Sequence, residues 1–405
     1  MCGFDFKHVF HLVIATLLLV AFCGMSVAQE QSEPSDKDEN RGRTGAYTVT
    51  RNGVTGEAMK QVLTRLNALK FADKYAKSVN QDGTLFEKQG EESVWEIAVP
   101  DDYNKDLPYG VLVYISARDN PKIGRRYKTV LSEHRMIMIA AQNSGNDHGT
   151  TWRMSRAVDA VQIVSQLYEV DNDRIYVSGT SGGGRAASQV AVVFSDIFDG
   201  GFYFVGCNFY KNVSAGGGSF TPGFWDRPDR RLLNEAKKNG RYVLFTGSKD
   251  FNREDTMRVH KAYLKDGFSQ SLYLEKPDHA HRDPPDDWFK KGMVFLDAPY
   301  SEQAAAEFEK AKTFQERDKL GAALTSFRIA SARAAGQSFQ EEANESFAEL
   351  QAKYLEKIAD VEAKIENADR KGANLSLSEF RKQWSPASNE IAKRLSTKVR
   401  KLPKN

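Results

Sequence analysis

Cysteine is scarce in this sequence of 405 residues, which contains only three cysteines. So small a number excludes a fold that is held together by disulfide bonds. Neither sign of charge dominates, because 57 Lys and Arg residues stand against 54 Asp and Glu, for a net charge of +3. This balance gives no electrostatic reason to expect nucleic acid as the main partner. The remaining composition, 40% hydrophobic and 27% charged, is typical of a soluble globular protein long enough for two domains.

An apolar run stands at the amino terminus. Lys7 precedes the run Val9 to Phe22, and the small residues Ser26-Val27-Ala28 follow it. This order is typical of a secretory signal peptide, and it predicts that residues 1–28 are removed by cleavage after Ala28. The predicted protein is therefore exported, to the periplasm or the extracellular space.

Two other interpretations of the amino terminus remain open. One is an uncleaved membrane anchor, for which the apolar run is short. The other is a lipoprotein at Cys23, where bulky Phe22 occupies the position of a small residue. Cleavage after residue 28 leaves Cys207 as the single cysteine, which we expect to be a small core residue. Residues 29–44 are polar and predict a flexible linker.

Strand and helix patterns alternate between residues 45 and 297. Apolar residues at helical spacing predict an amphipathic helix over Gly56–Lys77, and further helices are expected at Ser155–Tyr168, Gly184–Phe194 and Glu254–Asp266. Several β-branched or aromatic runs lack alternation, as in strands buried on both faces of a mainly parallel sheet. The predicted strands are Val94–Val99, Gly110–Ser116, Met136–Ala141, Arg174–Ser178, Gly201–Gly206, Arg241–Gly247 and Ser271–Glu275. This order predicts a doubly wound α/β domain over residues 45–297.

The carboxyl-terminal residues 298–405 have a different composition, rich in Ala, Glu, Lys, Gln and Arg. Their apolar residues recur in steps of three and four, as in Phe347, Leu350 and Tyr354. This pattern predicts a small all-helical domain. The last fifteen residues are basic without an acid. They are either a solvated helix end or a contact to an anionic envelope surface or a protein.

A short glycine-rich motif is the strongest chemical signal. Gly179-Thr180-Ser181-Gly182-Gly183 directly follows a predicted strand and opens a predicted helix. A serine in such a strand–turn–helix is held at the edge of the sheet, and the N–H of Gly182 is placed to meet a developing oxyanion. The alternative, a phosphate-binding loop, lacks the Lys-Ser/Thr ending. The motif therefore predicts Ser181 as a nucleophile.

Histidine is also scarce, which narrows the search for a base that activates Ser181. Of seven histidines, two lie in the predicted signal peptide, and the acid-then-histidine order expected after the serine excludes His134 and His148. His260 falls in a helical pattern, so His279 and His281 remain, in the loop after Ser271–Glu275. Asp250 follows the strand Arg241–Gly247 and is the candidate acid. The two histidines with Asp278 and Asp283 are also a candidate metal site, but the strand setting favours the triad, and we expect no metal.

Four stretches of the chain resemble a known family. They are residues 173–185, 196–200, 246–252 and 277–285, and over residues 90–297 the chain resembles an α/β-hydrolase, most of all the secreted esterases related to polyhydroxybutyrate depolymerases and feruloyl esterases. The resemblance implies Ser181 as nucleophile and Asp250 as acid. It matches His281 to the histidine of the family's Pro-Gly-x-Gly-His loop, with His279 as a neighbour. It also implies cleavage of small-molecule or polymeric carboxylic esters through an acyl-enzyme, without a cofactor.

The sequence departs from this family in two places. Many members carry His-Gly after the strand that supplies the second oxyanion donor, whereas Tyr114-Ile115 is followed here by Ser116-Ala117-Arg118. The backbone N–H of Ala117 or of Arg118 is the expected donor. The histidine loop has also lost both glycines, which is expected to affect where His281 lies.

Weaker signals point to substrate contacts and to other functions. Asn143 and Trp152 follow a strand end that faces the serine, and Trp225 ends a glycine-rich aromatic stretch. Each is a candidate substrate-binding residue or ordinary packing. Two alternatives to the esterase stay open: a non-catalytic relative that acts as a binding module, and a serine peptidase of the prolyl-oligopeptidase type.

Overall fold

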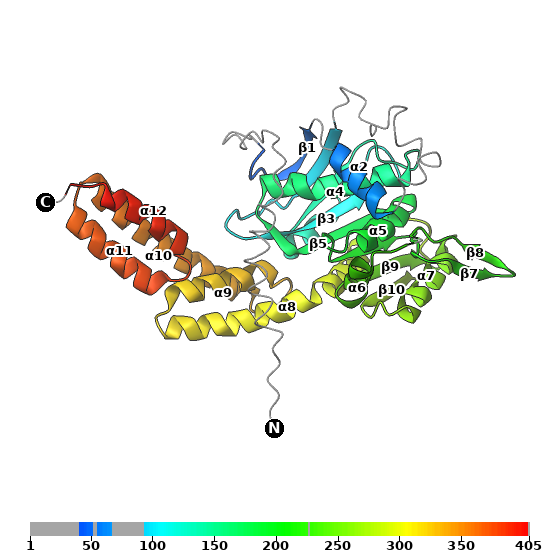
Figure 1. Ribbon diagram of the computed structural model, residues 1–405. Helices are drawn as coiled ribbons and strands as arrows, with labels where there is room; N and C mark the ends of the chain where they lie inside the picture. The colour runs from blue at the N-terminus through cyan, green and yellow to red at the C-terminus, as the bar shows by residue number, and fades with distance from the viewer. Residues whose placement is uncertain (1–39, 52–54, 67–92, 226, 404–405) are drawn as a thin grey trace. The chain divides into compact units, whose positions relative to one another are not determined.

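A sheet of eight strands organises the part of the chain that the computed structural model describes, residues 40–51, 55–66, 93–225 and 227–403 (Figure 1). The strand order is β1-β2-β4-β3-β5-β6-β9-β10. Strand β2 runs antiparallel to β1 and β4, and the other neighbours pair in parallel. The strands are β1 (Gly45–Arg51), β2 (Ser93–Val99), β3 (Tyr109–Ile115), β4 (Met136–Ala141), β5 (Val170–Thr180), β6 (Gly200–Phe204), β9 (Arg241–Gly247) and β10 (Ser271–Lys276).

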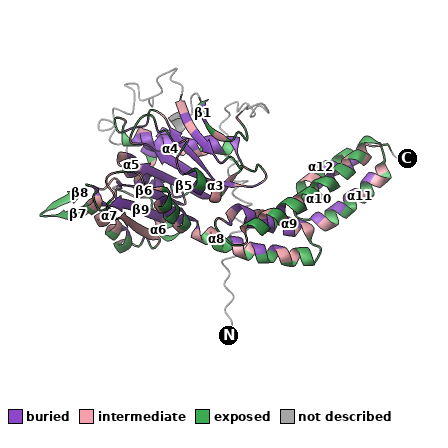
Figure 2. Cartoon of the chain, turned by 180° about the vertical axis from the view of Figure 1, so that it is seen from behind, coloured by how far each residue is buried: buried purple, intermediate pink, exposed green. Residues whose placement is uncertain are grey.

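Helices cover both faces of this sheet. Along β3 every residue is buried, and successive side chains alternate between two apolar clusters: Val111 and Val113 join one, Leu112 and Tyr114 the other. The first cluster packs against α2 (Thr55–Arg65), α4 (Thr150–Leu167), α5 (Gly182–Val193), α6 (Arg230–Lys238) and α7 (Arg253–Lys265). The second packs against α3 (Lys128–Glu133) and α8 (Asp286–Glu316), and the buried strands stand out in Figure 2. The predicted doubly wound α/β architecture is confirmed.

The predicted strands and helices of the α/β domain are present, with shifted ends. Helix α4 begins at Thr150 rather than Ser155, and β5 begins at Val170 rather than Arg174. Strand β1, helices α3 and α6 and the hairpin of β7 (Val213–Gly216) and β8 (Ser219–Thr221) were not predicted. The predicted signal peptide, most of the linker and the second half of the helix expected over Gly56–Lys77 lie outside the described residues.

The carboxyl-terminal residues are helical, as predicted. The helices are α8, α9 (Leu320–Arg333), α10 (Gln340–Glu366), α11 (Arg370–Trp384) and α12 (Asn389–Arg400). Helix α8 continues across the boundary expected between residues 297 and 298, and the described residues from Asn40 onward form one compact unit. None of the helices described in this structure is long and apolar enough to cross a membrane.

Hydrogen bonds from arginine side chains join α9 to the sheet. The Arg135 guanidinium donates to the backbone oxygen of Ser331 at 2.9 Å. From the other direction, Arg333 of α9 donates to the Asp171 carboxylate at the start of β5, with Nε 2.7 Å from Oδ2. Both Ser331 and Arg333 lie at the end of α9. The helical region is therefore attached to the sheet through α9 as well as through α8.

A buried ion pair connects β5 to α8. Arg174 Nη2 lies 2.9 Å from Asp297 Oδ2, and both side chains are almost fully buried. Asp297 also receives His134 Nδ1 at 2.7 Å and the Tyr176 hydroxyl at 2.9 Å. Burial opposes both charges, but the Arg174 charge and the His134 hydrogen bond outweigh it for Asp297, so its pKa lies below the ordinary value. Asp297 is therefore charged at neutral pH.

We expect Asp297→Asn to lower the free energy of unfolding at pH 7 by about 3–5 kcal/mol, because it leaves the Arg174 charge buried without a counter-ion. The exposed pair Lys353–Glu349 on α10 is the control, and Glu349→Gln should cost less than about 1 kcal/mol. Since the pKa of Asp297 is lowered, the stabilisation is present at neutral pH and is lost as the pH falls below about 4. Urea unfolding at pH 7 and at lower pH measures both effects, and equal losses for the two variants would contradict them.

Candidate active site

Ser181 occupies a strained turn between β5 and α5. Its backbone angles are φ 56° and ψ −116°, a combination that non-glycine residues rarely adopt. Two backbone hydrogen bonds hold the turn: Ser181 N donates to Phe204 O at 2.8 Å, and Arg185 N donates to Ser181 O at 3.0 Å. Strain of this kind costs about 1–3 kcal/mol and tends to occur at active sites.

The glycines after Ser181 allow a close approach to neighbouring backbone. A Cβ atom at Gly183 would lie 1.9 Å from the backbone oxygen of Ile115, at the end of β3. A Cβ atom at Gly182 would lie 2.1 Å from Oδ1 of Asn146. The start of α5 therefore packs directly against the end of β3 and against the Asn146 side chain, which the sequence did not single out by itself.

His281 and Asp250 are joined by a hydrogen bond, with Nδ1 of the ring 2.7 Å from Oδ1 of the carboxylate. The Asp250 side chain is fully buried and the His281 side chain is 23% exposed. Asp250 also receives the Thr246 hydroxyl at 2.7 Å and the backbone N–H of Asn252 at 3.0 Å. These donors fix the carboxylate at the end of β9, so that one ring nitrogen of His281 is bound and Nε2 is left for other partners.

His279 lies apart from this pair. Its Nε2 atom is 3.1 Å from the backbone oxygen of Asp283 and 3.3 Å from that of Arg282. Its backbone oxygen receives Lys249 N at 2.9 Å. His279 therefore stabilises its own loop, and His281 is the histidine that the structure brings to Asp250.

The histidine loop keeps its position without the two glycines. Asp278 adopts the left-handed conformation, with φ 54°, which Asp tolerates better than most residues, and its backbone N–H donates to Ser248 Oγ at 2.8 Å. Farther along, the Asp283 carboxylate accepts hydrogen bonds from the Thr180 hydroxyl and from Arg126. The bond to Thr180 ties the loop to the residue directly before Ser181.

The ring of Phe251 stacks on His281, with centroids 4.0 Å apart, and Phe251 itself is 78% exposed. No sequence pattern predicts this contact. Among the described residues, no hydrogen bond joins the Ser181 hydroxyl to the His281 ring. Such bonds are often long in ligand-free sites and shorten when substrate binds.

The two amides expected to act as the second oxyanion donor differ in their bonding. The backbone N–H of Arg118 donates to Ser116 Oγ at 2.9 Å and is therefore occupied. No acceptor in the described part of the chain receives the N–H of Ala117. The carbonyl of the same peptide, Ser116 O, accepts Arg153 Nη2 at 2.8 Å, and Arg153 Nε donates to Ser144 O at 3.0 Å. The structure thus favours Ala117 over Arg118, and Arg153 fixes the orientation of its peptide.

Two features together define the fold type. The sheet is parallel except for β2, and a serine in a strained turn lies between β5 and α5. The chain has the α/β-hydrolase fold. No protein-family model and no curated protein matches the chain.

Solved structures with some likeness are hydrolases. They include the S-formylglutathione hydrolase of Staphylococcus aureus, with 14% identity over 63% of this chain and 98% of that one, at a TM-score of 0.41. The esterase Est1E of Butyrivibrio proteoclasticus shares 15% over 52% of this chain and 97% of that one, at 0.38. A dipeptidyl aminopeptidase IV homologue of Bacteroides ovatus shares 15% over 63% and 36%, at 0.39. At such low scores, function has to be argued from the site itself.

The other candidate residues of this α/β-hydrolase fold have structural partners. Asn143 accepts the Trp152 indole N–H through its backbone oxygen at 3.0 Å, and Trp152 packs against Met59 and Leu63 of α2. Trp225 is 2% exposed and donates to Arg65 O at 2.9 Å, so its indole belongs to the interior rather than to a substrate surface.

Two further sequence-based expectations concern Cys207 and metal binding. Burial raises the pKa of the Cys207 thiol to about 12, which leaves it protonated at neutral pH and without the reactivity of a thiolate. Cys207 is buried in the core, where the sequence placed it. No group of three or more potential metal ligands gathers within the described ranges.

We expect Ser181→Gly to raise the free energy of unfolding by about 1 kcal/mol, because glycine adopts the turn without strain. The matched control is Ser346→Gly, in the second turn of α10, which should lower stability by about 0.5 kcal/mol. Chemical unfolding of the two variants beside the natural protein measures this. A loss of stability at both positions would show that the turn at Ser181 is not strained.

Proposed function

We propose that this protein is a serine hydrolase that cleaves carboxylic esters through an acyl-enzyme. The observation that supports it most is the hydrogen bond of 2.7 Å between His281 and the buried Asp250, in a fold that places Ser181 in the strained turn after β5. A serine hydroxyl is a weak nucleophile and needs a base that a third group holds in position. Ser181, His281 and Asp250 are proposed to be these groups.

In the first half of the reaction, Ser181 Oγ attacks the ester carbonyl while His281 Nε2 accepts its proton. The carbonyl oxygen becomes an oxyanion, which the N–H groups of Gly182 and Ala117 stabilise. His281 then gives the proton to the departing alkoxide, so that the alcohol leaves neutral and the acyl group stays on Ser181. Asp250 holds Nδ1–H of the ring and stabilises the imidazolium without itself taking the proton.

In the second half, water replaces the alcohol. The water oxygen attacks the acyl carbonyl while His281 accepts a proton from the water, which gives a second tetrahedral intermediate. The bond between the acyl carbon and Ser181 Oγ then breaks, and His281 returns the proton to Ser181 Oγ. The acid is released and the free enzyme is restored. All groups in this scheme are side chains or amides of the chain itself. Small-molecule and polymeric esters are both candidate substrates.

Export is part of the same proposal. It rests on the sequence of residues 1–28, with a periplasmic or extracellular location after cleavage. The basic carboxyl-terminal segment suits a contact with an envelope surface or another protein, and no feature of the described residues suggests nucleic acid as a partner.

The first test is covalent labelling of Ser181. A fluorophosphonate probe should modify the folded protein once, and Ser181→Ala should abolish the label. His281→Ala should lower kcat on a model ester by about 10⁴-fold or more, since a triad acts as a unit. His279→Ala is the matched control, since the His279 side chain forms hydrogen bonds only within its own loop, and it should retain most of the activity.

The other outcomes separate the alternatives. A natural protein that folds but neither takes the label nor cleaves any ester of a series graded by acyl length is a binding module, and the proposal is then wrong. A labelled protein that cleaves peptide amides much faster than esters is a peptidase. Circular dichroism of each variant ensures that a loss of activity is not a loss of folding.

A second test concerns Arg153, a positioning residue for the oxyanion site. Burial lowers the pKa of its guanidinium to about 10, so it stays charged at neutral pH and clamps the Ser116 carbonyl. Arg153→Met frees the Ser116–Ala117 peptide to rotate. We expect kcat to fall by roughly 10- to 100-fold with little change in KM, because an oxyanion donor acts in the transition state.

Arg156→Met is the matched control for this variant. Arg156 lies on the same helix, is similarly buried, and donates to Gln142 O at 3.3 Å rather than to Ser116. Both variants should lose stability, and only Arg153→Met should lose kcat at a temperature where both are folded. Arg153→Lys, which keeps a positively charged hydrogen-bond donor group, should recover part of kcat. Equal effects of the two methionine variants on kcat would remove Arg153 from this role.

A further inference from the structure

A cavity beside Ser181 carries an unbalanced positive charge. It has a volume of about 300 Å³ and lies between the loop after β3 and the histidine loop. Three of its wall residues are neighbours of the proposed catalytic groups: Thr180 precedes Ser181, Arg282 follows His281, and Ala117 supplies the oxyanion amide. A substituent of a bound ester can therefore reach the cavity while the carbonyl lies at Ser181.

Four of the wall residues are cationic and one is acidic. Arg118, Lys122, Arg126 and Arg282 face the cavity together with Asp283. The acid is already occupied, because Asp283 accepts both Arg126 and the Thr180 hydroxyl. Its charge therefore balances Arg126 alone, and three cations remain.

These three cations have no carboxylate partner within ion-pair distance among the described residues, and all three are exposed. Asp119, which follows Arg118 in the sequence, has other partners: its Oδ1 lies 3.1 Å from His148 Nε2 and receives Gly145 N at 2.9 Å. Asp283, which follows Arg282, pairs with Arg126. Unpaired cations on one cavity wall create a positive potential, and guanidinium groups bind carboxylate, sulfate and phosphate through paired hydrogen bonds.

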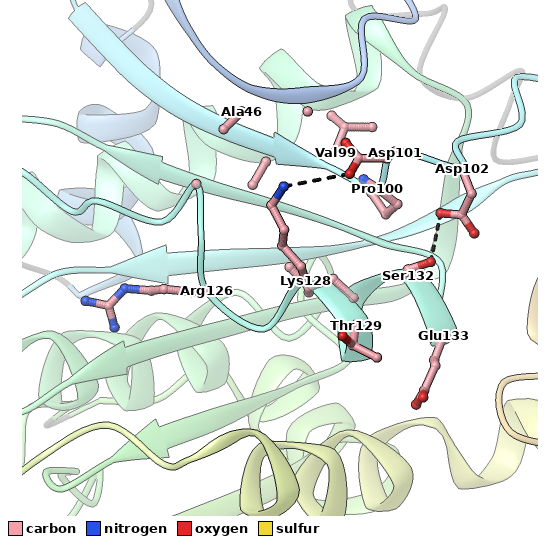
Figure 3. Close-up of a pocket in the computed structure, with 14 residues that line it drawn as sticks. Ala46, Val99, Pro100, Asp101, Asp102, Arg126, Lys128, Thr129, Ser132 and Glu133 are labelled. Atoms are coloured by element: carbon pink, nitrogen blue, oxygen red, sulfur yellow. Dashed lines mark hydrogen bonds and ion pairs between the residues drawn. The ribbon is translucent and has the colours of Figure 1, made fainter.

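In a second cavity nearby, the charged wall residues are paired with other groups of the protein. It has a volume of about 430 Å³, between β2 and α3, and is also lined by charged residues (Figure 3). There Lys128 Nζ lies 3.7 Å from Asp101, and Ser132 donates to Asp102 at 2.8 Å. Glu133, also on its wall, pairs with Lys290 at 2.6 Å. Its charges are compensated within the protein, unlike those beside Ser181.

We infer that the cavity beside Ser181 binds an oxyanion group of the substrate, so that the enzyme prefers esters with a carboxylate, sulfate or phosphate close to the scissile bond. Arg118, Lys122 and Arg282 are the residues that select it. The inference rests on the proposed esterase function and names its substrate class. An exposed cavity gives each charge a modest effect, and the three act together.

The test compares esters that differ only in charge. The 4-nitrophenyl monoester of glutaric acid is paired with 4-nitrophenyl glutaramate, in which an amide replaces the carboxylate. For the alcohol side, 3-carboxyphenyl acetate is paired with 3-carbamoylphenyl acetate. In at least one pair we expect kcat/KM to be about tenfold higher for the anionic ester at low salt, and the ratio to fall as NaCl is added.

Variants assign the preference to the cavity. R282Q, R118Q and K122Q should each lower the anionic-to-amide ratio by about two- to threefold, and the triple variant should bring it close to one. K128Q removes a cation of the β2–α3 cavity and should keep the ratio. Inorganic sulfate and phosphate should inhibit the natural protein more strongly than the triple variant, and the stronger of the two inhibitors indicates the geometry of the preferred anion.

Failure of this inference differs from failure of the proposed function. If a fluorophosphonate labels Ser181 and both members of each pair react equally, the oxyanion site is wrong and the esterase stands. A preference that survives in the triple variant also overturns the site, because other residues then select the anion. If Ser181 takes no label and no ester is cleaved, the proposed function fails and the inference falls with it.

Discussion

The buried ion pair between Arg174 and Asp297 is the constraint on which the rest of the structure depends. Arg174 lies in β5, which ends directly before Ser181, and Asp297 lies in α8, which begins soon after His281. The pair therefore joins the strand that leads to the proposed nucleophile to the helix that follows the proposed base. Because removing two charges from water is costly, the pair is stable only with all its partners in place, His134 and Tyr176 included.

Arginine has two different uses around the site. Arg153 is buried, and its donors are occupied by backbone oxygens, so it acts as a fixed support of the loop after β3. Arg118 and Arg282 are exposed and have no carboxylate of the described residues within ion-pair distance, so their charges remain available to a ligand. Two aspartates have different roles in the histidine loop. Asp278 adopts a backbone conformation that is usual for glycine, and Asp283 accepts a hydrogen bond from Thr180 that holds the loop beside Ser181.

The sequence-based predictions depended on local patterns, namely apolar runs and contiguous motifs. Strand β4 is apolar throughout and β9 has an apolar centre, and the motif around Ser181 is contiguous, so all three are visible without tertiary information. His281 followed from chain order and from a family resemblance. Strand β1 at the sheet edge lacks such a run. The choice between Ala117 and Arg118 depends on where the Ser116 hydroxyl points. The burial of Trp225 depends on Arg65, 160 residues earlier. Contacts of these kinds leave no local pattern.

Helix α8 is one continuous helix of 31 residues that begins beside the histidine loop and ends among the carboxyl-terminal helices. The change in amino-acid composition near residue 298 by itself suggests a domain that could be removed without effect on the sheet. Two buried arginines, Arg135 directly before β4 and Arg174 in β5, donate to Ser331 O and to Ala332 O, which lie beyond that point. Deletion there would remove one backbone acceptor from each of these two guanidinium groups. The sheet and the helices up to the end of α9 therefore form one stabilising unit, and the helices beyond α9 hold neither of these two acceptors.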